Sequence, residues 1–159
     1  MKVHPALAAL LSVAPVAAAG FAGSLVTMPA IPTWYAGLAK PFFTPPNWLF
    51  GPAWTLLYVL MASAFWRILT LDRPAIDKRA AIAAFVAQIF LNGLWSFAFF
   101  GWRSPGAGLV VIAALWLAIA ATIAAFARLD RLAAWLLAPY IAWTSYAAAL
   151  NAGVFLLNR

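Results

Sequence analysis

Residues 105–127 read PGAGLVVIAALWLAIAATIAAFA, an apolar stretch without a single charged side chain. A helix rises ~1.5 Å per residue, so about 20 such residues cross a hydrocarbon core of ~30 Å. The stretch lacks the alternation of apolar and polar residues that marks the strands of a membrane barrel, and it is rich in alanine, which favours helices. It therefore predicts a transmembrane helix.

Four more apolar stretches of similar length lie along the chain, at about 6–28, 52–71, 80–100 and 132–157. The composition agrees, because 67% of the residues are hydrophobic and only 8% are charged, against about 25% charged in a soluble domain. The sequence predicts an all-α integral membrane protein, a bundle of five transmembrane helices that forms one domain over residues 1–159.

The N-terminal stretch has a second interpretation. Lys2 followed by an apolar run and the alanines at 17–19 resembles a secretory signal with its cleavage site. The run continues through Phe21 and Leu25, which a spanning helix needs and a signal peptide does not. The spanning helix is the favoured interpretation.

The connection at about 29–51 differs from the others, since it holds five of the eleven prolines. Proline restricts the backbone, so we expect a folded, semi-rigid cap. Basic residues distribute unevenly about the predicted helices. Three lie on the side of this cap, Lys40, Arg103 and Arg159, and seven lie on the other side: Lys2, Arg67, Arg73, Lys78, Arg79, Arg128 and Arg131. This asymmetry predicts a cytoplasmic N-terminus.

Residues that support most kinds of catalysis are absent or misplaced. The chain has no cysteine, its one histidine is His4, and its three acidic residues fall in connections. Thiol chemistry, metal sites, carboxylate pairs and proton relays within the membrane are therefore excluded, and no cofactor is required. The net charge of +7 does not predict nucleic-acid binding, because the basic residues are scattered between apolar runs.

Tryptophan is abundant, with nine residues. Some fall near helix ends, where aromatic side chains commonly anchor a protein at the membrane interface. Trp116 and Trp143 fall near the middle of predicted helices, where an indole N–H needs a partner.

Polar and aromatic residues also recur at helical spacing, which places them on common faces. One interpretation is hydrogen bonding between helices, and the other is a cavity for a large, flat aromatic ligand beneath the cap. Lys40 either pairs with a carboxylate of that ligand or lies at the interface as an ordinary cation. The faces are Gln88, Asn92, Trp95 and Phe99; Trp54 and Tyr58; and Tyr140, Trp143, Ala147 and Asn151.

These residues resemble the translocator protein family (TspO/MBR), also known as tryptophan-rich sensory proteins or peripheral-type benzodiazepine receptor homologues. The similarity covers about 34–151. It includes WYxxLxKPxxxPPxWxFxxxW from Trp34 to Trp54, Asn92 with Trp95 and the FFG at 99–101, ALW at 114–116 and PYxxW at 139–143.

The resemblance implies a five-helix bundle in a bacterial membrane, commonly a homodimer, whose pocket beneath the first loop binds tetrapyrroles such as protoporphyrin IX. Carried over by position, the pocket would contain Tyr35, Pro45, Trp54, Tyr58, Asn92, Trp95, Phe99, Trp116, Trp143 and Ala147. Trp54 and Trp143 match tryptophans implicated in light- and oxygen-dependent porphyrin breakdown, so they are candidate catalytic residues. No tyrosine lies between Leu150 and Arg159, so the proposed sterol motif of the family is incomplete, which argues against sterol transport.

Two functions follow from this resemblance. The first is binding of porphyrins and related flat hydrophobic ligands, in their transport or in sensing and regulation. The alternative is enzyme-like porphyrin degradation. A run of small residues at 80–87 suits either a dimer contact or packing inside one subunit.

Overall fold

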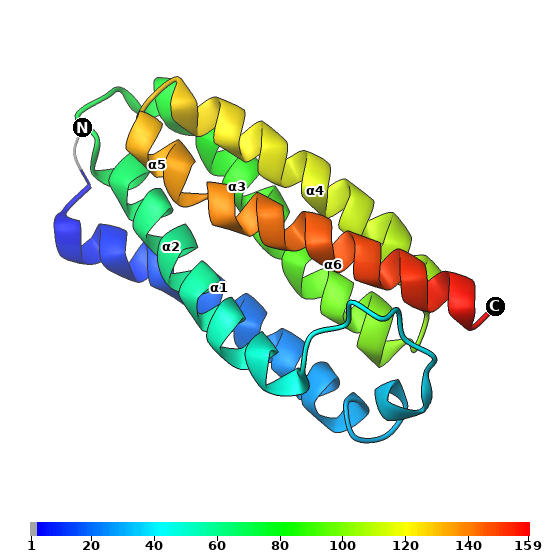
Figure 1. Ribbon diagram of the computed structural model, residues 1–159. Coiled ribbons are helices and arrows are strands. Elements are labelled where there is room, and N and C mark those ends of the chain that lie inside the picture. Colours follow the sequence, from blue (N-terminus) through cyan, green and yellow to red (C-terminus); the bar gives the residue numbers. More distant parts are fainter. Residues whose placement is uncertain (1–2) are drawn as a thin grey trace.

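The computed structural model describes residues 3–159, and all regular secondary structure in this range is helical. Figure 1 shows the helices running side by side along one long axis. The elements are α1 (Pro5–Ala30), η1 (Tyr35–Gly37), η2 (Asn47–Leu49), α2 (Phe50–Thr70), α3 (Ala75–Ser96), η3 (Phe97–Gly101), α4 (Pro105–Ala127), α5 (Arg131–Leu136) and α6 (Ala138–Leu157).

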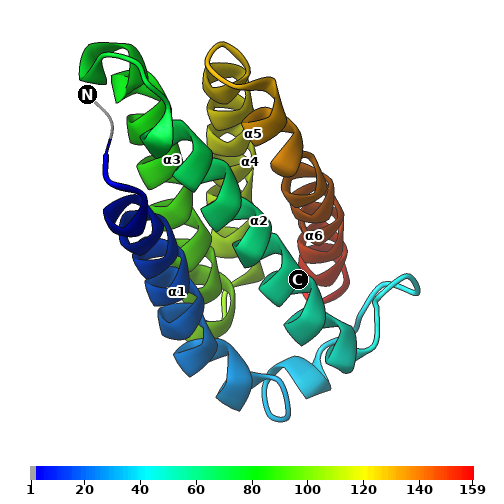
Figure 2. The ribbon, with the colours of Figure 1, turned by 90° about the vertical axis from the view of Figure 1, so that its left-hand side faces the viewer.

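The helices form a ring. Helix α1 packs against α2 and α3, α3 packs against α4, and α4 packs against α5 and α6, while α2 closes the ring against α5 (Figure 2). Five segments are long and apolar enough to cross a membrane, with α5 and α6 together forming the fifth. Only 22% to 33% of the most apolar part of each segment is buried inside the protein, which leaves a large apolar surface that suits a lipid environment. The predicted five-helix membrane bundle is confirmed.

Prolines determine where several of these helices begin or break. Pro74 and Pro105 mark the starts of α3 and α4, as expected where a missing N–H costs no hydrogen bond. Helix α3 begins at Ala75, earlier than predicted, and η3 continues it as a π-helical turn to Gly101. The predicted helix at 132–157 is divided at Leu137, because Pro139 cannot donate a backbone hydrogen bond to the preceding turn.

Stacked phenylalanines close the interior of the bundle toward the end that holds the α2–α3 and α4–α5 connections. Phe65 stacks on Phe85 with ring centroids 4.0 Å apart, and Phe126 stacks on Phe85 with ring centroids 6.0 Å apart. All three rings are buried. Aromatic pairs of this kind add ~0.5–1.5 kcal/mol beyond the area they bury, so this end of the bundle is a packed core.

Asp130 fastens this same end of the bundle. Its carboxylate accepts hydrogen bonds from the backbone N–H groups of Leu132 and Ala133 at the start of α5, and it pairs with Nε of Arg67 on α2 at 2.7 Å. Burial of the Asp130 carboxyl raises its pKa, but the hydrogen bonds from Arg67, Ala133 and Leu132 outweigh burial and hold the pKa below its usual value. One acidic residue therefore joins two neighbouring helices.

We predict that Asp130→Ala lowers the free energy of unfolding by about 1–2 kcal/mol, because it removes a helix N-cap and an ion pair. Asp130→Asn should lose less, since asparagine still caps the helix. The folded-state pKa is lowered, so the charge-dependent stabilisation is present above the unfolded pKa of about 3.9 and is lost as the pH falls below it. Unfolding followed in detergent between pH 7 and pH 3 measures both effects. Equal stability of the wild type and Asp130→Ala at pH 7 would contradict this role.

Candidate ligand-binding site

A cavity of about 600 Å³ lies between α1 and α2, beneath the connection that follows α1, and reaches α3. We call it the upper cavity. Its walls are mostly apolar and aromatic, as in typical small-molecule sites. The residues that line it are Gly20, Gly23, Ser24, Thr27, Met28, Ile31, Tyr35, Asn47, Trp48, Phe50, Gly51, Trp54, Thr55, Tyr58, Trp95, Ser96 and Phe100.

Four of the ten residues expected in a pocket line the upper cavity: Tyr35, Trp54, Tyr58 and Trp95. Trp54 and Tyr58 lie one helical turn apart on α2 with ring centroids at 5.4 Å. On α3, the Trp95 ring meets Phe100 edge to face at 5.9 Å. Aromatic rings from two helices and the connection thus face one space, which suits a flat ligand that stacks.

Asn92 holds Tyr58 in the cavity wall. The Tyr58 hydroxyl donates to Oδ1 of Asn92 at 3.2 Å, and Nδ2 of Asn92 donates to the Tyr140 hydroxyl at 3.0 Å. The Asn92 side chain is itself buried. It therefore links α2, α3 and α6 through hydrogen bonds, as expected for a polar side chain inside a membrane bundle.

Asn151 plays the same part for Trp95. Nε1 of Trp95 donates to Oδ1 of Asn151 at 3.1 Å, and Nδ2 of Asn151 donates to the Pro105 carbonyl oxygen at 2.7 Å. This arrangement needs Gly108, because a Cβ there would lie 2.6 Å from Oδ1 of Asn151 and 3.0 Å from the Phe99 ring. A glycine on α4 thus makes room for the amide that orients the cavity tryptophan.

Two more predicted residues do not line the cavity but pack against aromatic rings that do. Phe99 is buried and stacks on Trp95 at 5.5 Å, and it also contacts Tyr35 edge to face at 6.3 Å. Trp143 meets Phe50 edge to face at 6.2 Å, so it reaches the cavity wall through that ring.

The remaining predicted residues lie elsewhere. Pro45 and Ala147 are partly buried and outside the cavity lining. Trp116 lies outside it as well, where its Nε1 donates to Oγ of Ser145 at 2.8 Å between α4 and α6. Gln88 lies on the same predicted face as Asn92, one helical turn earlier on α3. Its side chain is buried, and its amide atoms have no hydrogen-bond partner among the described residues.

The connection between α1 and α2 is fastened to α6. The Asn158 side chain exchanges two hydrogen bonds with the backbone of Ala39, and the Tyr146 hydroxyl donates to the Phe43 carbonyl oxygen at 2.6 Å. Pro41 lies so close to α6 that a Cβ at Gly153 would be 2.7 Å from its ring. These contacts agree with the expected folded cap over the bundle.

The contribution of α1 was missed by reasoning from the sequence, which found only hydropathy there. Gly20, Ser24 and Thr27 recur at helical spacing and share one face, which lines the upper cavity. Small and weakly polar residues on one face of a membrane helix indicate close approach to a neighbour. This pattern is the sequence feature that could have indicated the contribution of α1 to the cavity.

We predict that Gly108→Ala destabilises the protein by about 1–3 kcal/mol, because the added methyl group overlaps Asn151 and Phe99. Gly51→Ala is the matched control: nothing lies within 4 Å of its added Cβ, and alanine in a helix is favoured by ~0.5–1 kcal/mol. Thermal unfolding in detergent should move in opposite directions for the two variants. A Gly108→Ala protein as stable as the wild type would show that Asn151 is not held as described.

The described residues 3–159 contain no group of three His, Cys, Asp or Glu side chains that could hold a metal ion. Comparison with known proteins matches residues 11–157 to the model of the TspO/MBR family. A tryptophan-rich protein TspO of Archaeoglobus fulgidus is 47% identical, with 92% of this chain and 94% of that protein covered.

A second tryptophan-rich protein TspO, from Chlorobaculum tepidum, is 42% identical over 89% of each chain. The Homo sapiens translocator protein is 37% identical, with 74% of this chain and 70% of that protein covered. Since a family model covers nearly the whole chain and relatives match it at this level over most of their length, the chain belongs to the TspO/MBR family.

Proposed function

We propose that this membrane protein binds porphyrins and related flat, hydrophobic ligands in the upper cavity, and acts in their transport or in sensing them. The observation that carries this proposal is the set of aromatic rings, Trp48, Trp54, Tyr58, Trp95 and Phe100, facing a single space. A volume of about 600 Å³ falls within the range of ~300–1,000 Å³ typical of small-molecule sites.

The polar groups near this space favour a ligand with an apolar body and an acidic edge. Tyr58 and Trp95 already use their polar atoms in hydrogen bonds to Asn92 and Asn151. Lys40 is different, because its ammonium has three N–H donors and only two of them go to the carbonyl oxygens of Ala36 and Leu38. Its Nζ lies 4.8 Å from the centre of the Tyr35 ring. This cation beside a cavity residue supports a pose in which porphyrin propionates lie at the cap and the macrocycle lies among the indoles.

We predict that Trp54→Ala weakens protoporphyrin IX binding about tenfold, because loss of a stacked indole costs ~1.4 kcal/mol or more. Trp116→Ala is the matched control, since Trp116 lies outside the cavity. Titration in the dark, followed by the Soret absorbance of the porphyrin, measures affinity without depending on the number of tryptophans left. Equal affinity of Trp54→Ala, Trp143→Ala and the wild type would remove the cavity as the binding site.

Illumination of the same samples separates binding from the alternative function, light- and oxygen-dependent degradation. Of the two candidate tryptophans, Trp54 is the better placed for degradation, because its ring lines the cavity, with its centroid 5.4 Å from that of Tyr58. Trp143 does not line the cavity and contacts its wall through Phe50. Several equivalents of porphyrin consumed per protein, with Trp54 intact, would favour the enzyme. Bleaching that ends after one equivalent favours a binding protein.

We further propose that the N-terminus faces the cytoplasm. Figure 1 shows the α2–α3 and α4–α5 connections at the end of the bundle opposite the cap, and the C-terminus at the cap end. Of the basic residues described in the structure, six lie in or beside the first two connections, Arg67, Arg73, Lys78, Arg79, Arg128 and Arg131, whereas Lys40 lies in the cap, Arg103 in the connection before α4 and Arg159 at the C-terminus. Basic residues concentrate on the cytoplasmic side of membrane proteins. The upper cavity would then lie near the outer surface.

Exposed small residues on α3 support a homodimer. Ala80, Ala83 and Ala87 recur at helical spacing and are exposed, so two copies of α3 could approach closely there. We predict that Ala83→Phe combined with Ala87→Phe converts a dimer to a monomer, measured by light scattering in mild detergent. Ala142→Phe, an equal change at an exposed position of α6, should leave the mass unchanged. A wild-type protein that is already monomeric would contradict the dimer.

A further inference from the structure

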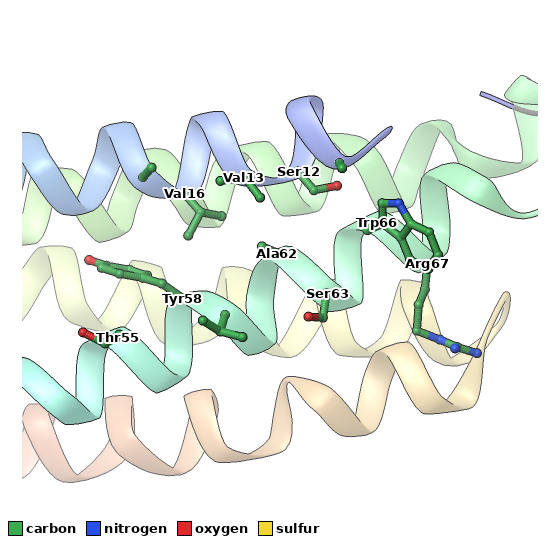
Figure 3. A pocket seen from close by; sticks show the side chains of 12 residues that line it. Ser12, Val13, Val16, Thr55, Tyr58, Ala62, Ser63, Trp66 and Arg67 are labelled. Atoms are coloured by element: carbon green, nitrogen blue, oxygen red, sulfur yellow. The ribbon is translucent and has the colours of Figure 1, made fainter. Parts of the chain in front are cut away.

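A second hollow lies along the same seam between α1 and α2, nearer the N-terminus of the chain. It has a volume of about 750 Å³ and ends beside Trp66 and Arg67. We call it the lateral groove. Figure 3 shows Val13 and Val16 of α1 facing Ala62 of α2 across it, and Ser12 and Ser63 also belong to its lining. Val13 and Ser63 are exposed, so in a membrane the groove opens toward lipid.

The lateral groove and the upper cavity meet. Thr55 and Tyr58 line both of them, and each of the two hollows has α1 on one side and α2 on the other. In Figure 3 the Tyr58 ring lies between the two helices, with its hydroxyl directed away from Arg67. One ring therefore stands at the junction between a space open to lipid and a space lined by tryptophans.

The Tyr58 ring is placed for a gate. It packs on α1 at Gly20, where an added Cβ would lie 2.6 Å from its Cε2 atom. Its hydroxyl hydrogen-bonds to Asn92, which keeps the ring turned toward the bundle. Rotation of this one side chain, against a single neutral hydrogen bond worth ~0.5–1.5 kcal/mol, would join the two hollows.

The opposite approach to the cavity is more firmly closed. The cap is tied to α6 by the hydrogen bonds of Asn158 and Tyr146 and by the contact of Pro41 with Gly153. Toward the other end, the stacked rings of Phe65, Phe85 and Phe126 fill the interior. The seam between α1 and α2 is thus a side where the cavity adjoins a second hollow that is open to the surroundings.

We propose that the lateral groove is the portal through which a flat, apolar ligand dissolved in the bilayer enters and leaves the upper cavity, with Tyr58 as its gate. This inference rests on the proposed binding function and adds the route. The groove wall suits such a passage, because most of its residues are apolar or small, including Ala9, Ala17 and Ala62, and the one charged residue, Arg67, lies at its end. A ligand that partitions into lipid arrives at the groove without crossing water or lifting the cap.

The absence of cysteine from the chain allows a reversible test. Ser63→Cys places a thiol in the groove but outside the cavity lining, and a benzyl methanethiosulfonate reagent adds a bulky group there that a reductant removes. Ala17→Cys does the same from α1. The control, Ala121→Cys, is exposed on α4 across the ring. Each variant is studied in lipid vesicles with protoporphyrin IX by stopped-flow absorbance.

Labelling at position 63 or 17 should slow both association and dissociation about tenfold and leave the dissociation constant unchanged, because blocking a path does not alter its end states. Reduction should restore both rates in the same sample, which excludes misfolding, and the labelled control should behave as the unlabelled protein. Unchanged rates at both groove positions, with porphyrin still bound, would overturn the portal but not the binding function. Failure of every unlabelled variant and of the wild type to bind porphyrin would overturn the proposed function itself.

Discussion

The arrangement of this bundle depends on two asparagine side chains, Asn92 and Asn151, that satisfy polar groups where no water is present. Inside a membrane an unpaired hydroxyl or indole N–H costs several kcal/mol, so a hydrogen-bond partner stabilises the fold strongly. Asn92 pairs with Tyr58 and Tyr140, and Asn151 pairs with Trp95 and the Pro105 carbonyl. These bonds connect α3 to α2 and α6, and α6 to α4, and they fix side chains that face the upper cavity.

The same bonds reconcile the two interpretations of the polar faces that the sequence left open. Asn92 does act in hydrogen bonding between helices, and its partner Tyr58 lines the cavity. Satisfying the polar atoms internally leaves the ring faces of Tyr58 and Trp95 as the surfaces available to a ligand. A cavity built in this way selects for flat apolar shape through stacking and packing, with few polar groups to fix orientation.

The two ends of the bundle serve different purposes. At one end, the stacked phenylalanines and the Arg67–Asp130 pair produce a packed and fastened core. At the other end, glycines on α1 and the proline-rich cap leave room beneath the connection. Both hollows lie between α1 and α2, on either side of the close contact of Gly20 with Tyr58, because a helix face of small residues fills less volume than a face of large ones.

The membrane fold could be predicted from the sequence. Five long apolar stretches with few charges have one physical solution, helices that cross the bilayer, and the break before Pro139 follows from a missing N–H. Helical spacing also placed Asn92, Trp95 and Phe99 on one face. Which faces meet could not be predicted in this way. Trp116 reaches Ser145 instead of the cavity, Trp143 lies behind Phe50, and α1 forms a whole cavity wall. The reason is that periodicity gives the direction of a side chain around its own helix, whereas its neighbours depend on how all five helices pack.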